Sequence, residues 1–143
     1  MKKIIYIALL FVAVINSAVA SGNKIDTRAI NSFNSAYYEA TDVGWRFEQS
    51  FVKVNFELKG KKLLAYYQPS GELIATSEKI SLEDLPVDAK RRFAKKYSGY
   101  TVKEAVKFET TDEMAYFILA VNENGSEIVK VSDCGFVSLY RKM

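Results

Sequence analysis

Short segments in which apolar and polar residues alternate make up most of the chain after residue 40. They are separated by turn signals such as Lys59-Gly60-Lys61 and Pro69-Ser70-Gly71. Alternation with a period of two is typical of strands that bury one face. Because loops of about two to five residues join antiparallel neighbours, the pattern predicts antiparallel hairpins. The predicted strands are 45–49, 51–58, 62–67, 73–80, 102–109, 114–121, 128–132 and 136–141.

A segment near residue 30 carries apolar residues at helical spacing instead. Ile30, Phe33 and Tyr37 fall on one side of a helix. Asp26 or Thr27 can cap its first turn, because a side-chain oxygen there accepts from an unpaired backbone N–H. The segment therefore predicts a helix with one aromatic side that needs a surface to cover.

A second helical segment precedes the strand predicted at 102–109. Ala89, Phe93 and Tyr97 keep a spacing of four residues until Ser98-Gly99 ends the pattern. Pro86 suits the first helical position, because that position needs no N–H donor. This helix also has one apolar side.

The chain resembles itself when it is shifted by about 60 to 65 residues. Phe33, Tyr37, Phe47 and Glu48 recur as Phe93, Tyr97, Phe108 and Glu109. The order of these matches holds over most of the chain. We therefore predict an α+β fold of two tandem repeats, at 21–80 and 81–143, each a helix packed on a three- to four-stranded antiparallel sheet.

One phase of the alternation is apolar in both predicted repeats, so we assign it to the face that the helices cover. A slip of one residue in register would exchange the two faces. The assigned residues are Trp45, Phe47, Val52, Val54, Phe56, Leu58, Ala65, Tyr67, Leu73, Ala75, Val106, Phe108, Phe117, Leu119, Val121, Val129, Val131, Val137 and Leu139.

The opposite phase mixes charged residues with tyrosines, which gives a candidate surface for binding a partner. Tyrosine buries a large area at low entropic cost and keeps a hydroxyl for the rim of an interface. Cross-strand pairing that only stabilises the sheet is the alternative. The candidate residues are Tyr66, Tyr116, Tyr140, Lys53, Lys107 and Lys130.

The first 20 residues have the pattern of a secretory signal peptide. Lys2 and Lys3 precede an apolar run at 4–15, and Ala18-Val19-Ala20 forms a small-x-small cleavage site. The apolar run is shorter than the roughly 20 residues that a spanning helix needs. We therefore expect a periplasmic or secreted protein without stable membrane insertion after cleavage.

Composition removes several classes of chemistry. The 143 residues include no His, which excludes Ser-His-Asp triads, Cys-His dyads and every zinc site with a His ligand. The basic and acidic residues, 20 and 17, are nearly balanced, which argues against nucleic-acid binding. The single cysteine, Cys134, lies in the turn sequence Asp133-Cys134-Gly135. We predict no catalytic, cofactor-binding or metal-binding residues.

The order of several short motifs resembles the exported bacterial PepSY-like proteins, also called β-lactamase-inhibitor-like (BLIP-like) proteins. The motifs are Val52-x-Val54-x-Phe56, Ala65-x-Tyr67, Gly71-Glu72-Leu73, Leu85-Pro86, Tyr100-Thr101-Val102-Lys103-Glu104-Ala105 and Asp133-x-Gly135. The resemblance implies tandem helix-and-sheet repeats, an extracytoplasmic location and no catalytic activity. It also implies binding or inhibition of another protein through the sheet.

We therefore expect a non-enzymatic exported module that binds an unidentified extracytoplasmic protein. The more specific version is inhibition of a peptidase or another hydrolase through the open face of the sheet. The alternative is a carrier of a small apolar ligand, with its pocket between helix and sheet.

Overall fold

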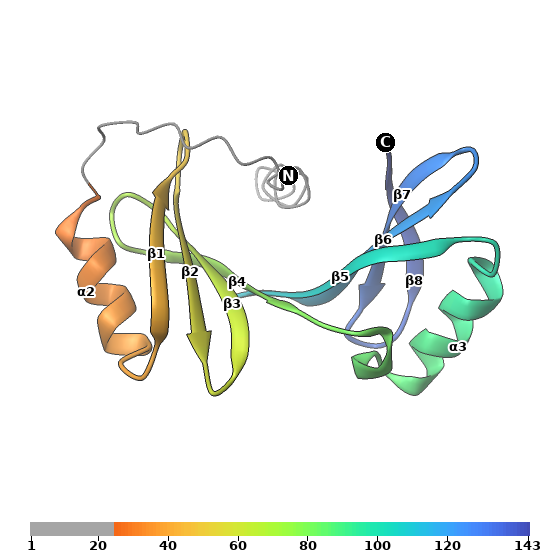
Figure 1. Cartoon of the computed structure of the whole chain (residues 1–143), viewed down its shortest axis with the longest axis horizontal. Helices are drawn as coiled ribbons and strands as arrows, with labels where there is room; N and C mark the ends of the chain where they lie inside the picture. Colours follow the sequence, from red (N-terminus) through yellow and green to blue (C-terminus); the bar gives the residue numbers. More distant parts are fainter. Residues whose placement is uncertain (1–24) are drawn as a thin grey trace.

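A computed structural model describes residues 25–143 of the chain; the predicted signal peptide, 1–20, lies outside them. Eight strands form one sheet in sequence order, and every neighbouring pair is antiparallel. Figure 1 shows the strands between two helices at opposite ends of the long axis. The strands are β1 (Thr41–Phe47), β2 (Val52–Leu58), β3 (Lys61–Tyr67), β4 (Leu73–Lys79), β5 (Thr101–Thr110), β6 (Met114–Asn122), β7 (Gly125–Ser132) and β8 (Val137–Lys142). The helices are α2 (Thr27–Ala36) and α3 (Val87–Lys96), with a short 3-10 helix at Leu82–Asp84.

The predicted fold of two tandem helix-on-sheet repeats is wrong. Strands β4 and β5 pair with each other, from Ala75 opposite Thr110 to Lys79 opposite Val106. The eight strands therefore form one continuous sheet. The connection between β4 and β5 contains α3. Local periodicity does not indicate whether the strands before and after such a connection belong to the same sheet. Pairing β4 with β5 removes two exposed sheet edges, which is the physical reason for joining the halves.

Helix α2 begins and packs as its sequence predicts. The Asp26 side chain accepts a hydrogen bond from the backbone N–H of Arg28 at 2.8 Å, so Asp26 is the cap. The Phe33 ring is buried and lies 5.3 Å from the Trp45 ring and 5.0 Å from the Phe56 ring, measured between centroids. Aromatic rings from β1 and β2 therefore fill the space beneath α2.

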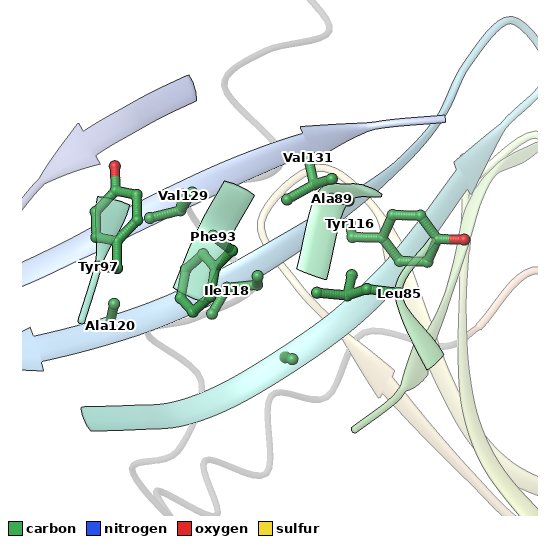
Figure 2. Packing of buried hydrophobic residues seen from close by; sticks show 10 residues of the cluster. Leu85, Ala89, Phe93, Tyr97, Tyr116, Ile118, Ala120, Val129 and Val131 are labelled. Atoms are coloured by element: carbon green, nitrogen blue, oxygen red, sulfur yellow. The ribbon is translucent and has the colours of Figure 1, made fainter. Parts of the chain in front are cut away.

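Helix α3 packs on the second half of the sheet. Pro86 is its cap residue, one position before the predicted one, because the helix begins at Val87. Ala89, Phe93 and Tyr97 are buried against the sheet, as their spacing predicts. Figure 2 shows these side chains directed at residues of β6 and β7. The buried cluster consists of Leu85, Ala89, Phe93, Tyr97, Ala105, Tyr116, Ile118, Ala120, Val129 and Val131.

The turn between β3 and β4 packs closely against the first turn of α2. Gly71 has a φ of +94°, and a Cβ there would lie 2.9 Å from the backbone carbonyl carbon of Arg28. We expect Gly71→Ala to combine left-handed strain with this contact and to lower the free energy of unfolding by about 2–4 kcal/mol. Chemical denaturation of the purified variant measures this loss.

Gly60 provides the matched control for Gly71. Its φ is +78°, but a Cβ there would meet nothing within 4 Å. Gly60→Ala should therefore cost only the left-handed strain, about 1–2 kcal/mol. Equal losses in the two variants would show that the contact with Arg28 contributes nothing.

The predicted face assignment is correct for β2 and β7 and wrong for β5 and β6. Tyr116 and Ile118 pack under α3, whereas Phe117 belongs to a separate cluster on the other face. Both phases of β6 are apolar, so alternation alone could not distinguish them. The residues that lie opposite to their assigned face are Ala75 on β4, Val106 and Phe108 on β5, and Phe117, Leu119 and Val121 on β6.

Candidate functional site

Both helices cover the same face of the sheet. Val54, which packs under α2, is paired in register with Ala65, then Thr76, then Glu109 on β5. Residues paired in this way share a face, and Glu109 shares its face with Ala105, which packs under α3. The opposite face, which neither α2 nor α3 covers, is called the helix-free face below.

A row of aromatic rings crosses the helix-free face from Phe51, directly before β2, to Tyr140 on β8. Between ring centroids, Phe51 lies 5.8 Å from Tyr66, Tyr66 lies 6.3 Å from Phe108, and Phe108 lies 6.1 Å from Phe117. Phe117 in turn lies 5.2 Å from Tyr140. Contacts of this length are favourable for aromatic pairs. This aromatic row gives the helix-free face an apolar floor that joins the two halves of the sheet.

A groove of about 410 Å³ lies beside the aromatic row. Half-buried Leu64 and Val106 supply apolar surface, and charged residues from five strands surround them. We call this groove the central groove. It is lined by Asp42, Asn55, Phe56, Glu57, Lys62, Leu63, Leu64, Ser77, Lys79, Glu104 and Val106.

Two hydroxyl groups lie at the floor of the helix-free face beside the central groove. Ser77, which lines the groove, is only 5% exposed. The Tyr66 hydroxyl lies close to the Ser77 side chain but has no hydrogen bond of normal geometry with any described residue. Burial raises the pKa of Tyr66 to about 12, and Ser77 offsets part of that rise. The Tyr66 hydroxyl therefore stays protonated and is available as a donor.

Lys53 lies next to Tyr66 in register on the same face. Burial lowers the pKa of Lys53, while Glu48 and Glu104 oppose that shift and Arg46 adds to it. None of the ion pairs within 4.0 Å among residues 25–143 includes Lys53. Its ammonium group is therefore partly desolvated without a close counter-ion.

The structure divides the predicted binding residues between the two faces. Tyr66, Lys53, Lys130 and Tyr140 lie on the helix-free face, and the Lys130 ammonium lies 6.0 Å from the centroid of the Phe117 ring. The placement of the other two on this face is wrong. Tyr116 is buried in the α3 cluster, and Lys107, which pairs with it in register, lies on the helix-covered face.

Sequence reasoning missed the residues that shape the face most. Alternation places Val106, Phe108 and Phe117 on the helix-covered face, and no sequence pattern groups Ser77 and Leu64 with them. The available signal was the segment 114–121, which is apolar in both phases and therefore has to be buried on both sides.

The remaining chemistry of the described chain is limited. Within residues 25–143, no group of three or more Cys, Asp or Glu side chains is placed to hold a metal ion. Cys134 is exposed, and its Sγ lies 3.0 Å from Ser132 Oγ. None of the helices in this range has the length and apolar character needed to cross a membrane.

No protein-family model matches the sequence, and no curated protein matches it. Solved structures do match. A DUF2874 family protein from Bacteroides ovatus is similar with a TM-score of 0.75 and 17% identity, over 85% of this chain and 88% of that one. A BLIP-like protein from Bacteroides fragilis matches with a TM-score of 0.73 and 14% sequence identity, over 85% of this chain and 86% of that one. A Bacteroides eggerthii protein, provisionally described as periplasmic, matches with a TM-score of 0.75 and 13% sequence identity, over 85% of this chain and 89% of that one.

These similarities show that the chain has a BLIP-like fold. None of these three structures is described as PepSY-like, so that part of the sequence resemblance finds no support. At these identities, the similarity establishes the arrangement of the chain and nothing about its partners.

Proposed function

We propose that this chain is a non-enzymatic, exported module that binds another protein through its helix-free face. The observation that carries the proposal is the anatomy of that face. Half-buried Leu64 and Val106 lie in a groove over an aromatic floor, and charged side chains surround them. Protein interfaces have the same arrangement, with an apolar centre and a polar rim.

Export to the periplasm or beyond is supported by two observations. The first 20 residues have the pattern of a signal peptide. In addition, a protein of the same fold is provisionally described as periplasmic. The partner would therefore be an extracytoplasmic protein.

A non-enzymatic role is supported by the chemistry of the groove. The sequence holds no His that could serve as a general base. The pKa of Tyr66 is raised to about 12, which makes its hydroxyl a poor nucleophile near neutral pH. Hydrogen bonding and packing are the capacities that this face offers.

Inhibition of a peptidase or another hydrolase is the more specific form of the proposal. It is supported by the BLIP-like fold and by the groove on the helix-free face, which a protruding loop could enter. The alternative, an apolar-ligand pocket between helix and sheet, is less well supported. Buried side chains, including the Phe33 and Phe93 rings, occupy the spaces beneath α2 and α3.

Site-specific photocrosslinking in the native cell envelope tests the proposal. The photoreactive residue p-benzoylphenylalanine would replace Leu64 on the helix-free face or, as a control, exposed Val87 on α3. We expect a discrete protein adduct from position 64 and none from position 87. Leu64→Lys should lower recovery of the same protein by about tenfold or more, because it places a charge in the apolar centre. An adduct from position 87 alone, or from neither position, would contradict the proposal.

A further inference from the structure

The two helices pack on the sheet in the same way but carry very different charge. Each buries an alanine and a phenylalanine, which are Ala29 and Phe33 on α2 and Ala89 and Phe93 on α3. Helix α2 contains a single charged residue, whereas α3 contains five basic residues and one acidic residue. Packing on the sheet therefore does not require the positive charge of α3.

Most of the basic residues of α3 lie on the side that faces away from the sheet. Figure 1 shows α3 at one end of the long axis of the molecule. The fifth basic residue, Lys90, is half-buried, and its ammonium group lies 2.6 Å from the Glu83 carboxylate. The four exposed basic residues are Arg91, Arg92, Lys95 and Lys96. We call these four residues the basic side of α3.

The chain neutralises the basic side only to a small extent. Arg91 lies 4.0 Å from Asp88, and the two side chains are 78% and 75% exposed. An ion pair this exposed contributes little. Arg92 donates to a backbone carbonyl at 3.3 Å, and none of the ion pairs within 4.0 Å among residues 25–143 includes Lys95 or Lys96. The basic side therefore stays available to an external anion.

The arrangement of these charges is unfavourable for the isolated helix. Residues four positions apart are neighbours on a helix, and like charges at that spacing destabilise it. Arg91 and Lys95 form one such pair, and Arg92 and Lys96 form another. Lys95 and Lys96 interact favourably with the helix dipole in the last turn, but Arg91 and Arg92 lie outside that turn. An anionic surface against the helix would offset this repulsion.

The positive charge of α3 is also separated from the negative charge of the molecule. Residues 25–143 carry 17 basic and 17 acidic residues, because Lys2, Lys3 and Lys24 lie before them. Since α3 holds five of the basic residues and one of the acidic ones, the remainder has a net negative charge. An anionic surface therefore attracts the α3 end and repels the rest, which orients the molecule.

A lipid bilayer with anionic headgroups fits the basic side of α3 better than a protein does. The outer side of a helix is convex, and the central groove contains no α3 residue. Arginine and lysine side chains are long and flexible, so several of them can reach a flat surface at once. Export, which the pattern of the first 20 residues predicts, also brings the chain next to membrane surfaces.

We propose that the basic side of α3 binds reversibly to an anionic phospholipid surface of the cell envelope. The four basic residues contact headgroup phosphates, and Val87, which is 68% exposed and lies one turn before Arg91, enters the headgroup region. This inference does not rest on the proposed function. Because α3 covers the opposite face of the sheet, the helix-free face stays open to a partner protein while the chain is on the membrane.

Sedimentation with lipid vesicles tests the inference. The purified protein, without the predicted signal peptide, would be mixed with vesicles of phosphatidylcholine alone or with about one third phosphatidylglycerol. Each basic residue near an anionic leaflet strengthens binding by about fivefold. We therefore expect binding to the anionic vesicles to be at least about thirtyfold tighter, and to weaken as salt is added because ions screen the attraction.

A triple variant locates the binding surface. Arg91→Gln, Lys95→Gln and Lys96→Gln together should weaken binding to the anionic vesicles by about thirtyfold or more. Arg92 is kept, because it donates to the backbone of the turn before β8. The substitutions remove like-charge repulsion, so the melting temperature should not fall by more than a few degrees. The melting temperature thus separates loss of binding from loss of folding.

A second triple variant is the matched control, because it removes the same amount of charge from the other half of the sheet. The three lysines are exposed, and none of the ion pairs within 4.0 Å in the described part of the chain includes them. Binding to the anionic vesicles should change by less than about threefold, since charges far from the membrane are screened. The substitutions are Lys59→Gln, Lys62→Gln and Lys79→Gln.

Several results would contradict the inference. Equal binding to the two kinds of vesicle, binding to neither, or equal losses in the two triple variants would overturn it. If the protein binds no vesicles but the α3 triple variant loses the protein adduct at position 64, the basic side serves a protein and the inference is wrong. The photocrosslinking result does not depend on vesicle binding, so the failure of one proposal leaves the other standing.

Discussion

Replacing Phe33 with alanine is expected to lower the free energy of unfolding by about 3–5 kcal/mol. The Phe33 ring is 1% exposed and contacts the rings of Tyr37, Trp45, Phe56 and Tyr67. Alanine would remove most of these contacts and leave a cavity beneath α2. Thermal and chemical denaturation followed by circular dichroism would measure the loss.

Tyr38→Ala serves as the control, because the Tyr38 side chain is 81% exposed. A substitution at such a site should change stability by about 0.5 kcal/mol or less.

Because one sheet joins both halves, we also expect Phe33→Ala to unfold in a single transition. Two transitions, of which only one shifts, would show that the segments on either side of residue 80 fold separately.

Phe117→Ala is expected to cost about 3–5 kcal/mol as well, although Phe117 lies on the face without a helix. Its ring is 1% exposed and contacts the rings of Phe108 and Tyr140. The Phe117 ring links Tyr140 to the rest of the aromatic row, so its removal should also disturb Phe108, the next ring along. Denaturation measures the loss of stability, and the NMR signals of Phe108 report the local change.

Phe136→Ala is the matched control for Phe117→Ala. Phe136 precedes β8 in the same half of the sheet and is 64% exposed, so its removal should have little effect on stability. Phe117→Leu, which keeps most of the volume, should recover much of the lost stability. A small loss in Phe117→Ala, similar to that of Phe136→Ala, would mean that the helix-free face has no packed core of its own.

Part of the candidate site was predictable from the sequence. Tyr66 and Lys53 share the phase opposite to Val54 and Ala65, and the structure places both on the helix-free face. The central groove was not predictable, because its lining comes from β1 to β5 and depends on the pairing of β4 with β5. That pairing brings Glu104 and Val106 beside Leu64 and Ser77.

Local periodicity by itself determined the eight strands, the two helices and the turns that join them. These features depend on residues that are close in the chain, such as the Asp26 cap and the Ala89, Phe93 and Tyr97 stripe. The same repeating pattern suggested two separate sheets, which is wrong, because resemblance between segments does not specify whether their strands pair.

Only the tertiary structure decided that there is one sheet and which face β5 and β6 present to α3. Edge pairing between β4 and β5 depends on backbone groups that every residue carries, so side-chain patterns contain little information about it. In β6 both phases are apolar, and the choice between Tyr116 and Phe117 for the helix-covered face is made by packing against α3. The helix-free face, with its groove and aromatic row, is a consequence of those two choices.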